Sequence, residues 1–168
     1  MAIPDFVVAL RAKIGTDPLW LSGVTAVVTR PSPGSSEPEV LLVRRADNGA
    51  WTPVTGIIDP GEQPADAAAR ETLEEAGVVA VAERLAAVHT LPPMTYENGD
   101  QAQYLDLVFR LRWVSGEPWP ADGENTEAAW FPLSVLPAVS DEMRGRIEVA
   151  LSDEAAARFV VTATDAPG

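Results

Sequence analysis

The sequence predicts an α/β protein of one domain, because strand and helix patterns follow each other along a chain of 168 residues. Apolar residues alternate strictly from Gln103 to Trp113, as is typical of a strand in a sheet. Residues 23–30 and 39–45 are rich in β-branched and aliphatic side chains. Residues 140–154 have apolar residues at helical spacing behind a Ser/Asp cap. A chain of this length can bury a substantial core.

The first third of the chain contains a helix pattern and then two strand patterns. Residues 4–14 have apolar residues at helical spacing, with Pro4 suited to a first turn and Gly15 to an end. They predict a short amphipathic N-terminal helix. The strand patterns at 23–30 and 39–45 flank a loop of Pro, Gly and Ser, and they predict a hairpin. The next ten residues are rich in turn formers.

The second helix pattern runs from Pro64 to Ala76, and Gly77 can close it as a left-handed C-cap. Residues 78–91 predict a strand with a bulge, followed by a loop. A polar loop and a short strand in "AAWFPL" precede the last helix, and the final residues read as a weak helix or an extended tail. One face of the alternating strand carries Leu105, Leu107, Phe109, Leu111 and Trp113.

Charge and composition exclude several classes of function. The formal net charge is −13, from 25 acidic and 12 basic side chains, which disfavours nucleic acid polymers and anionic membranes as partners. The chain has no cysteine, so disulfides, thiolate metal sites and cysteine nucleophiles are excluded. No stretch reaches the roughly 18 apolar residues of a membrane span, and the start lacks a signal-peptide core. We therefore expect a cytoplasmic protein.

Glu71, Glu74 and Glu75 concentrate negative charge on one arc of the predicted helix, because successive helical residues turn by ~100°. Their mutual repulsion, near the negative end of the helix dipole, is unfavourable unless something positive is present. Oxygen ligands without histidine or cysteine suit Mg²⁺, Mn²⁺ or Ca²⁺ rather than Zn²⁺. A solvated acidic face is the alternative interpretation. A divalent cation would also allow a small phosphorylated substrate.

The spacing of residues around this cluster resembles the Nudix box, G-x5-E-x7-R-E-U-x-E-E-x-G-U, in which U is a bulky aliphatic residue. The positions are filled by Gly56, Glu62, Arg70, Glu71, Glu74, Glu75, Gly77 and Val78. The one departure is Thr72 at the first U, which should cost some apolar packing beneath the helix. The resemblance covers residues 20–152 and leaves 1–19 as an N-terminal helical extension and 153–168 as a C-terminal tail. It implies the Nudix fold, an α/β/α sandwich with a mixed β-sheet.

The resemblance implies a pyrophosphohydrolase that uses metal-activated water, with Mg²⁺ or Mn²⁺ as cofactor. Its substrate would be a nucleoside diphosphate linked to another group, either a nucleotide sugar such as ADP-ribose or a nucleoside triphosphate. A non-catalytic Nudix ligand-binding or sensor domain is the alternative, but such domains commonly lose box carboxylates. An isomerase that shares the fold would need a nucleophilic cysteine, which is absent.

The resemblance also implies roles for the box residues. Glu71 and Glu75 would be metal ligands, Glu74 a ligand or the base that activates water, and the Gly56 carbonyl a backbone ligand. Arg70 would act in catalysis by orienting the first helical carboxylate.

Three more box residues would position these groups. Glu62 would pair with the box arginine, and Gly61 would allow tight turning. Gly77 would end the helix.

Residues outside the box are expected to complete the site. A further acid commonly comes from a later loop, and Glu124 is the first candidate, followed by Glu127. Arg44 and Arg45 at a strand end could contact phosphates, and Tyr104 could stack on a base. Surface ion pairs and core packing are the respective alternatives.

Some other side chains are expected to be structural. His89 follows an apolar run and is more consistent with a structural role than a catalytic one. Trp51 is expected to pack beside the box loop. Phe6 and Leu10 on the N-terminal helix leave room for a homodimer.

Overall fold

A computed structural model describes residues 3–161, and it shows one mixed sheet with a helix on each face. In chain order the elements are α1 (Asp5–Ile14), β1 (Leu19–Arg30), β2 (Glu39–Arg45), β3 (Trp51–Thr52), β4 (Val54–Ile57), α2 (Pro64–Ala76), β5 (Val79–Thr90), β6 (Met94–Thr95), β7 (Gln101–Ser115), β8 (Asn125–Pro132), the 3-10 turn η1 (Leu133–Val135), α3 (Asp141–Leu151) and β9 (Arg158–Phe159). The expected α/β sandwich is confirmed.

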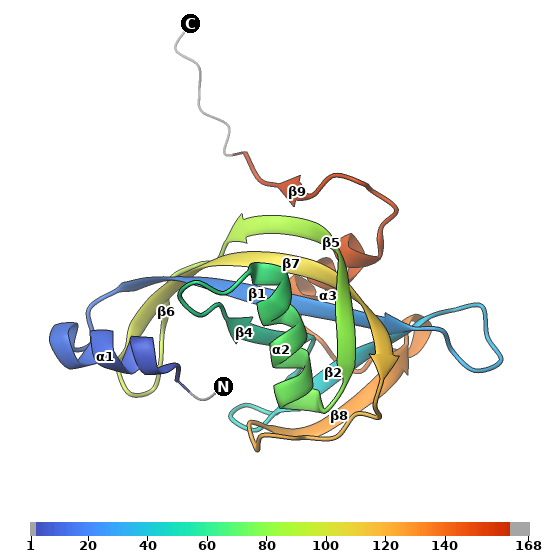
Figure 1. Ribbon diagram of the computed structural model, residues 1–168, viewed down its shortest axis with the longest axis horizontal. Helices are drawn as coiled ribbons and strands as arrows, with labels where there is room; N and C mark the ends of the chain where they lie inside the picture. Colours follow the sequence, from blue (N-terminus) through green and yellow to red (C-terminus); the bar gives the residue numbers. More distant parts are fainter. Residues whose placement is uncertain (1–2, 162–168) are drawn as a thin grey trace, which may run out of the picture.

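The centre of the sheet is a long parallel pair, β1 and β7 (Figure 1). Their register runs from Leu19 opposite Ala102 to Thr29 opposite Arg112. The path through the sheet is β3-β2-β1-β7-β5-β9, and β4, β6 and β8 pair with β1, β7 and β2 respectively. The pairing of β4 with β1 places Gly56 opposite Val24, and so fixes where the loop before α2 begins.

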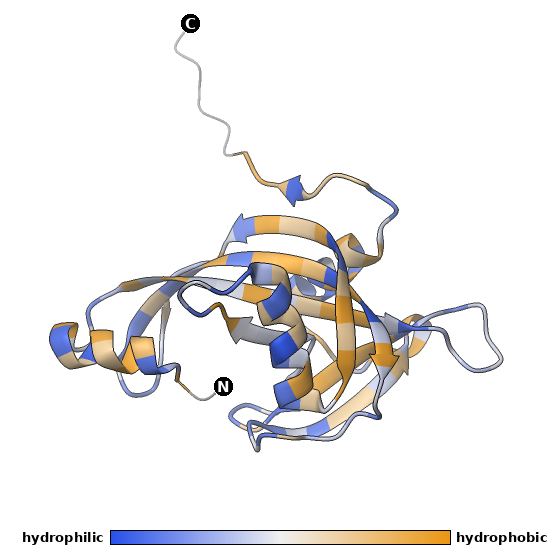
Figure 2. Ribbon diagram, viewed as in Figure 1, coloured by the Kyte–Doolittle hydropathy of each residue, from blue (hydrophilic) through white to orange (hydrophobic). Residues whose placement is uncertain are grey.

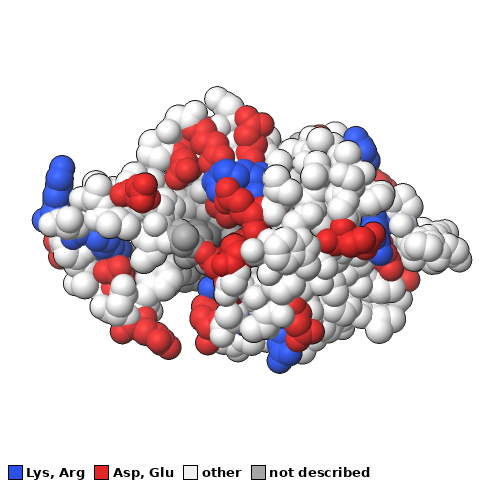
Figure 3. All heavy atoms as spheres, turned by 60° about the horizontal axis from the view of Figure 1, so that its bottom comes forward, with Lys and Arg blue, Asp and Glu red and all other residues white. Residues whose placement is uncertain are grey.

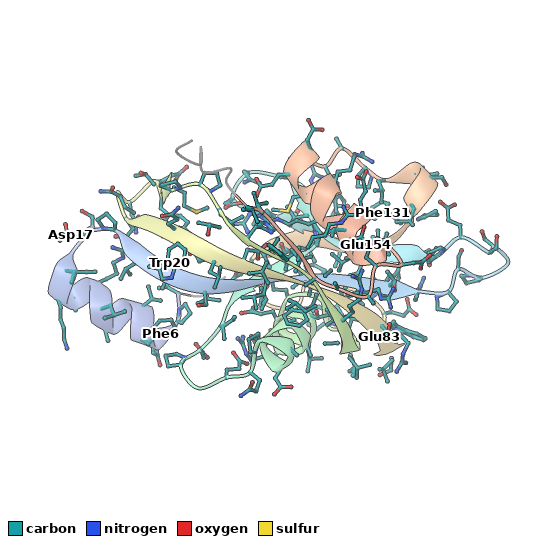
Figure 4. The ribbon with its side chains drawn as sticks, turned by 90° about the horizontal axis from the view of Figure 1, so that it is seen from above. Phe6, Asp17, Trp20, Glu83, Phe131 and Glu154 are labelled. Atoms are coloured by element: carbon teal, nitrogen blue, oxygen red, sulfur yellow. The ribbon has the colours of Figure 1, made fainter. Side chains whose placement is uncertain are left out.

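The two helical layers bury the two faces of the sheet. Phe109 and Leu111 of β7 belong to the core cluster that includes the alanines of α2. Val108, the residue before Phe109, belongs to the cluster that contains Ile147 of α3. This alternation confirms the strand predicted from Gln103 to Trp113. Figure 4 shows α2 and α3 on opposite sides of the sheet, and Figure 2 shows apolar residues along the central strands.

The helix boundaries agree closely with the sequence signals. α2 has the predicted limits, and Gly77 ends it with φ of 67° and an N–H bond to Leu73 O. The Ser140 side chain accepts a hydrogen bond from Met143 N at the start of α3. Thr72 is fully buried, and its hydroxyl donates to Ala68 O at 2.7 Å, so the departure from the box pattern leaves no unpaired polar group.

The sequence patterns missed several short strands. β3, β4 and β6 lie in segments expected to be turns or loops, and β8 begins at Asn125, inside the expected polar loop. Strands of two to four residues are too short to show a period in sequence, and they exist because neighbouring strands pair with them. Near the C-terminus, β9 pairs in parallel with β5, while the end of the predicted tail lies outside the described residues.

Candidate metal-binding and catalytic site

A cleft of about 700 Å³ lies between the start of α1 and the box helix α2. The loop that follows β4 and the loop before β8 form its other walls. The carboxylates that line it belong to Asp5, Asp59, Glu71, Glu74, Asp122 and Glu124. Figure 3 shows acidic side chains gathered around a hollow on this face of the molecule. Such a concentration of negative charge disfavours a bare phosphate group and favours a cation.

Gly56 and Glu71 approach each other very closely. A Cβ atom on residue 56 would lie 2.1 Å from the Glu71 carboxyl carbon, so only glycine leaves room for this carboxylate against the main chain. Glu71 is 6% exposed. Burial raises the pKa of Glu71 above its usual value, and the neighbouring Arg70 opposes this shift. The energetic cost of burying this charge favours a positive partner.

Arg70 holds the carboxylates around it in fixed positions. Its Nε and Nη2 atoms donate to the two oxygens of Glu62 at 2.8 and 2.9 Å, which is a bidentate pair. Its Nη1 atom lies 3.0 Å from Glu71 Oε1 and 2.9 Å from Glu74 Oε2. Nη2 also donates to Ile57 O at 3.1 Å. Hydrogen bonding to Arg70 lowers the pKa of Glu62, and these bonds tie the loop before α2 to the helix.

Glu75 faces a different set of partners. It is 6% exposed and accepts a hydrogen bond from Asn125 Nδ2 at 3.1 Å. Burial raises the pKa of Glu75 to about 7, against the smaller opposing effect of Asn125. Carboxylate oxygens of Glu75, Asp122 and Glu124 all lie within 4.8 Å of one another. Asp122 was not among the predicted residues, although it stands two positions before Glu124 in the sequence.

The loop that carries Asp122 and Glu124 is attached to the end of α2. Trp119 N donates to Ala76 O and Ala121 N donates to Glu75 O, both at 3.1 Å. The last carbonyl groups of a helix lack partners within the helix, and this loop supplies them. The same bonds bring the loop acids towards the box carboxylates.

Three other predicted residues and Glu127 are not among the residues that line the cleft. Arg44 Nη1 lies 2.7 Å from Glu127 Oε1, which is a pair between β2 and β8. Arg45 pairs with the aspartate two residues later. The Tyr104 hydroxyl lies 2.8 Å from that of Tyr96, and the ring is half-buried. A contact of these residues with substrate stays a prediction.

His89 and Trp51 lie on the side of the sheet that α3 covers. His89 Nε2 is 3.4 Å from Asp106 Oδ2, whose side chain is buried beneath α3. The ring of Trp51 meets Phe131 edge-on at 5.0 Å, in the core cluster of α3. Trp51 was expected beside the box loop, but the pairing of β3 with β2 brings it to this cluster instead.

The available donors suit a hard divalent cation. The box and loop acids that converge here offer carboxylate oxygens, and the close approach at Gly56 brings main chain next to Glu71. Arg70 bridges Glu71 and Glu74, whereas Glu75 groups with the loop acids. This acidic arrangement, in which Glu71 and Glu75 are buried, could hold one or more metal ions.

The fold and site define an α/β/α domain with a carboxylate-bearing loop and helix beside an acidic cleft. Residues 20–150 match the family model described as the NUDIX domain, and the chain therefore belongs to the Nudix family. No helix within residues 3–161 is both long and apolar enough to cross a membrane.

Curated relatives share the central part of the chain. The 8-oxo-dGDP phosphatase NUDT18 of Homo sapiens is 33% identical over 109 residues, covering 61% of this chain and 31% of that protein. The NAD-capped RNA hydrolase NudC of Pseudomonas aeruginosa is 34% identical over 101 residues, covering 59% of this chain and 34% of that protein. The chain thus spans about a third of the length of these relatives. A MutT-like protein of Streptomyces ambofaciens is 32% identical over 114 residues, covering 68% of this chain and 65% of that protein.

Solved structures share the fold at lower identity. An ADP-ribose pyrophosphatase from Streptococcus suis has a TM-score of 0.62 and 21% identity, covering 83% of this chain and 98% of that one. The NUDIX domain of Shewanella oneidensis NrtR, solved in complex with ADP ribose, has a TM-score of 0.60 and 18% identity. The match covers 88% of this chain and 97% of that one. These two likenesses support the fold.

Proposed function

We propose that this protein is a divalent-metal-dependent pyrophosphohydrolase that cleaves the pyrophosphate linkage of a nucleoside diphosphate derivative. The observation that carries this proposal is the convergence of box and loop carboxylates on one cleft, with Glu71 lying over Gly56. We assign this activity to residues 20–152, and treat 1–19 and 153–168 as additions to the catalytic domain.

The box residues have complementary roles in this proposal. Glu71, Glu74 and Glu75, with the Gly56 carbonyl, would hold Mg²⁺ or Mn²⁺. When bound, such a cation neutralises charge on the phosphates and lowers the pKa of an attacking water. Arg70 keeps the Glu71 and Glu74 carboxylates in place through its ion pairs.

A carboxylate oxygen must also accept the proton of the attacking water. Glu74 and Glu124 both line the cleft and are the two candidates for this base. Glu74 is half-exposed, so its carboxylate can reach solvent. Asp122 lies beside Glu124 and adds negative charge at the same place.

The expected substrate is a small nucleotide. Two of the curated relatives are named for 8-oxo-dGDP and for NAD-capped RNA, and both 8-oxo-dGDP and the NAD cap contain a diphosphate. A cleft of about 700 Å³ is in the usual range for a small ligand. The net charge of −13 disfavours a polymer. A nucleotide sugar such as ADP-ribose and a nucleoside triphosphate are the two substrate types that we propose to compare.

A substrate panel tests the proposal directly. Purified protein with Mg²⁺ or Mn²⁺ should release nucleoside monophosphate or inorganic phosphates from at least one nucleoside diphosphate derivative, and EDTA should abolish the release. Glu74→Gln and Glu75→Gln should lower kcat by at least about a hundredfold. Glu148→Gln, on the exposed side of α3, is the matched control and should retain full activity.

The panel also separates an enzyme from a ligand-binding domain. If the wild-type protein binds nucleotides with Mg²⁺ but hydrolyses none of them, the pyrophosphohydrolase proposal fails and the sensor alternative replaces it. Loss of activity in Glu148→Gln to the same extent as in Glu75→Gln would also contradict the assigned site.

A further inference from the structure

The helix α1 lies before the segment that matches the Nudix family, yet it is firmly packed on the domain. Val7 is 6% exposed and belongs to a core cluster with Leu21, Ile57 and Ala102. Ile57 is the last residue of β4, next to Gly56. The apolar side of α1 is therefore packed beside the start of the box loop.

Arg11 fixes the C-terminal end of α1. Its Nη1 atom donates to Gly15 O at 3.1 Å and to Asp17 O at 2.6 Å, and its Nη2 atom donates to Gln101 O at 2.7 Å. Its Nε atom lies 3.5 Å from Asp100 Oδ2. The contacts with Gln101 and Asp100 connect α1 to the first residue of β7 and to the turn before it. Val7 near the start of α1 and Arg11 near its end therefore both attach the helix to the domain.

The N-terminal end of α1 forms one wall of the acidic cleft. Pro4, Asp5 and Phe6 line it, across from Glu71 and Glu74. Phe6 is half-buried against the core cluster that contains Val7 and is one of the residues that line the cleft. Figure 4 labels it at the start of α1. The only charged side chain that α1 contributes to the cleft is the carboxylate of Asp5.

The charges that line the cleft favour one orientation for a nucleotide that binds there. The diphosphate must lie at the α2 side, where the box carboxylates can hold cations. Asp5 disfavours phosphate at the α1 side, which leaves that end to the uncharged part of the substrate. An aromatic ring and a planar base attract each other by stacking, and this attraction depends little on which base is present.

We propose that α1 is a fixed wall of the substrate cleft and that Phe6 stacks on the base of the nucleotide, so that it selects ligands that carry a base over ligands that carry none. This inference rests on the proposed function for the placement of the diphosphate. It assigns a role in substrate selection to the N-terminal extension, which the family match does not include.

Binding measurements test this inference without requiring hydrolysis. The dissociation constants of ADP and of inorganic pyrophosphate are measured by calorimetry with Mg²⁺ present, for the wild-type protein and for Phe6→Ala. ADP has a base and pyrophosphate has none. The Kd of ADP should rise about tenfold in Phe6→Ala, whereas the Kd of pyrophosphate should stay the same.

Two further variants separate stacking from a displaced helix. Phe6→Trp should restore ADP binding, because it retains an aromatic face. Val8→Ala, at an exposed position of the same helix, should bind both ligands like the wild type. Circular dichroism and thermal melts establish that each variant is folded.

The inference is overturned if the Kd of ADP does not change in Phe6→Ala, or if ADP and pyrophosphate weaken equally. A wild-type protein that binds ADP no more tightly than pyrophosphate also overturns it. If Phe6→Ala weakens ADP binding as expected but the wild-type protein hydrolyses no substrate, only the proposed enzymatic function is contradicted. Failure of the stacking inference and failure of the proposed function are thus distinguishable.

Discussion

The indole of Trp119 lies directly against Gly77, so that a Cβ atom on residue 77 would come within 2.2 Å of Trp119 Nε1. Gly77 also has a φ of 67°, in the left-handed region where L side chains are strained. This glycine therefore ends α2 and at the same time makes room for the loop that carries Asp122 and Glu124.

Replacing Gly77 should affect both the helix end and the loop. Gly77→Ala is expected to lower the free energy of unfolding by about 2–4 kcal/mol, because backbone strain and a steric clash combine. Gly34→Ala is the matched control, since Gly34 has φ of 78° with no atom near its Cβ position, and it should lose only about 1 kcal/mol. Urea denaturation measures both. Equal losses would show that the contact with Trp119 has no energetic effect.

The close approach of Gly56 and Glu71 leads to a second prediction. A methyl group at residue 56 collides with the Glu71 carboxyl group, so Gly56→Ala should displace this proposed ligand. We expect Mg²⁺ affinity and activity to fall at least about tenfold. Gly145→Ala in α3, where the Cβ position is open, should leave both unchanged. Titration of Mg²⁺ by calorimetry gives the affinity, and an unaltered Kd in Gly56→Ala would refute the assignment of Glu71.

Arg70 should be irreplaceable by lysine despite the equal charge. Lysine cannot reproduce the bidentate pair with Glu62 while also contacting Glu71 and Glu74. Arg70→Lys is expected to reduce kcat by about 10–100-fold with little change in secondary structure. Steady-state kinetics provides the measurement, with Arg144→Lys on the exposed side of α3 as control. Full activity in Arg70→Lys would mean that these ion pairs do not position the carboxylates.

Removing the charge of Glu75 should stabilise the metal-free protein while abolishing its activity. Burial raises the pKa of Glu75 from 4.5 to about 7, so between these pH values the folded protein binds a proton that the unfolded chain releases. Stability contributed by this group is therefore lost as pH rises from about 4.5 to 7.

The comparison is made in EDTA by chemical denaturation at several pH values. Glu75→Gln retains an acceptor for Asn125 and should be about 1–3 kcal/mol more stable than the wild type at pH 8, with a smaller difference at pH 5. A lower stability of Glu75→Gln at pH 8 would contradict this account.

The parts of the site that the sequence reveals are those with local signals. The limits of α2 follow from Pro64 and Gly77, and the carboxylates of the box follow from fixed spacing along one helix. Asp122 was missed, and β8 was expected to begin later, because both depend on where the preceding loop attaches. That attachment uses main-chain bonds to the carbonyl groups of Glu75 and Ala76, which leave no pattern in the side chains. Likewise, no local signal in the N-terminal residues indicates that Phe6 borders the cleft.

The attachment of α1 through Arg11 has a consequence for which substitutions this part of the chain tolerates. Arg11 donates hydrogen bonds to main-chain carbonyls at Gly15, Asp17 and Gln101, and it also forms an ion pair with the Asp100 side chain. A main-chain carbonyl is present whatever side chain the residue carries, so substitutions at positions 15, 17 and 101 leave these three acceptors in place. The link between α1 and the rest of the domain therefore depends on the identity of Arg11 and on the apolar contact of Val7, and little on which side chain stands at position 101.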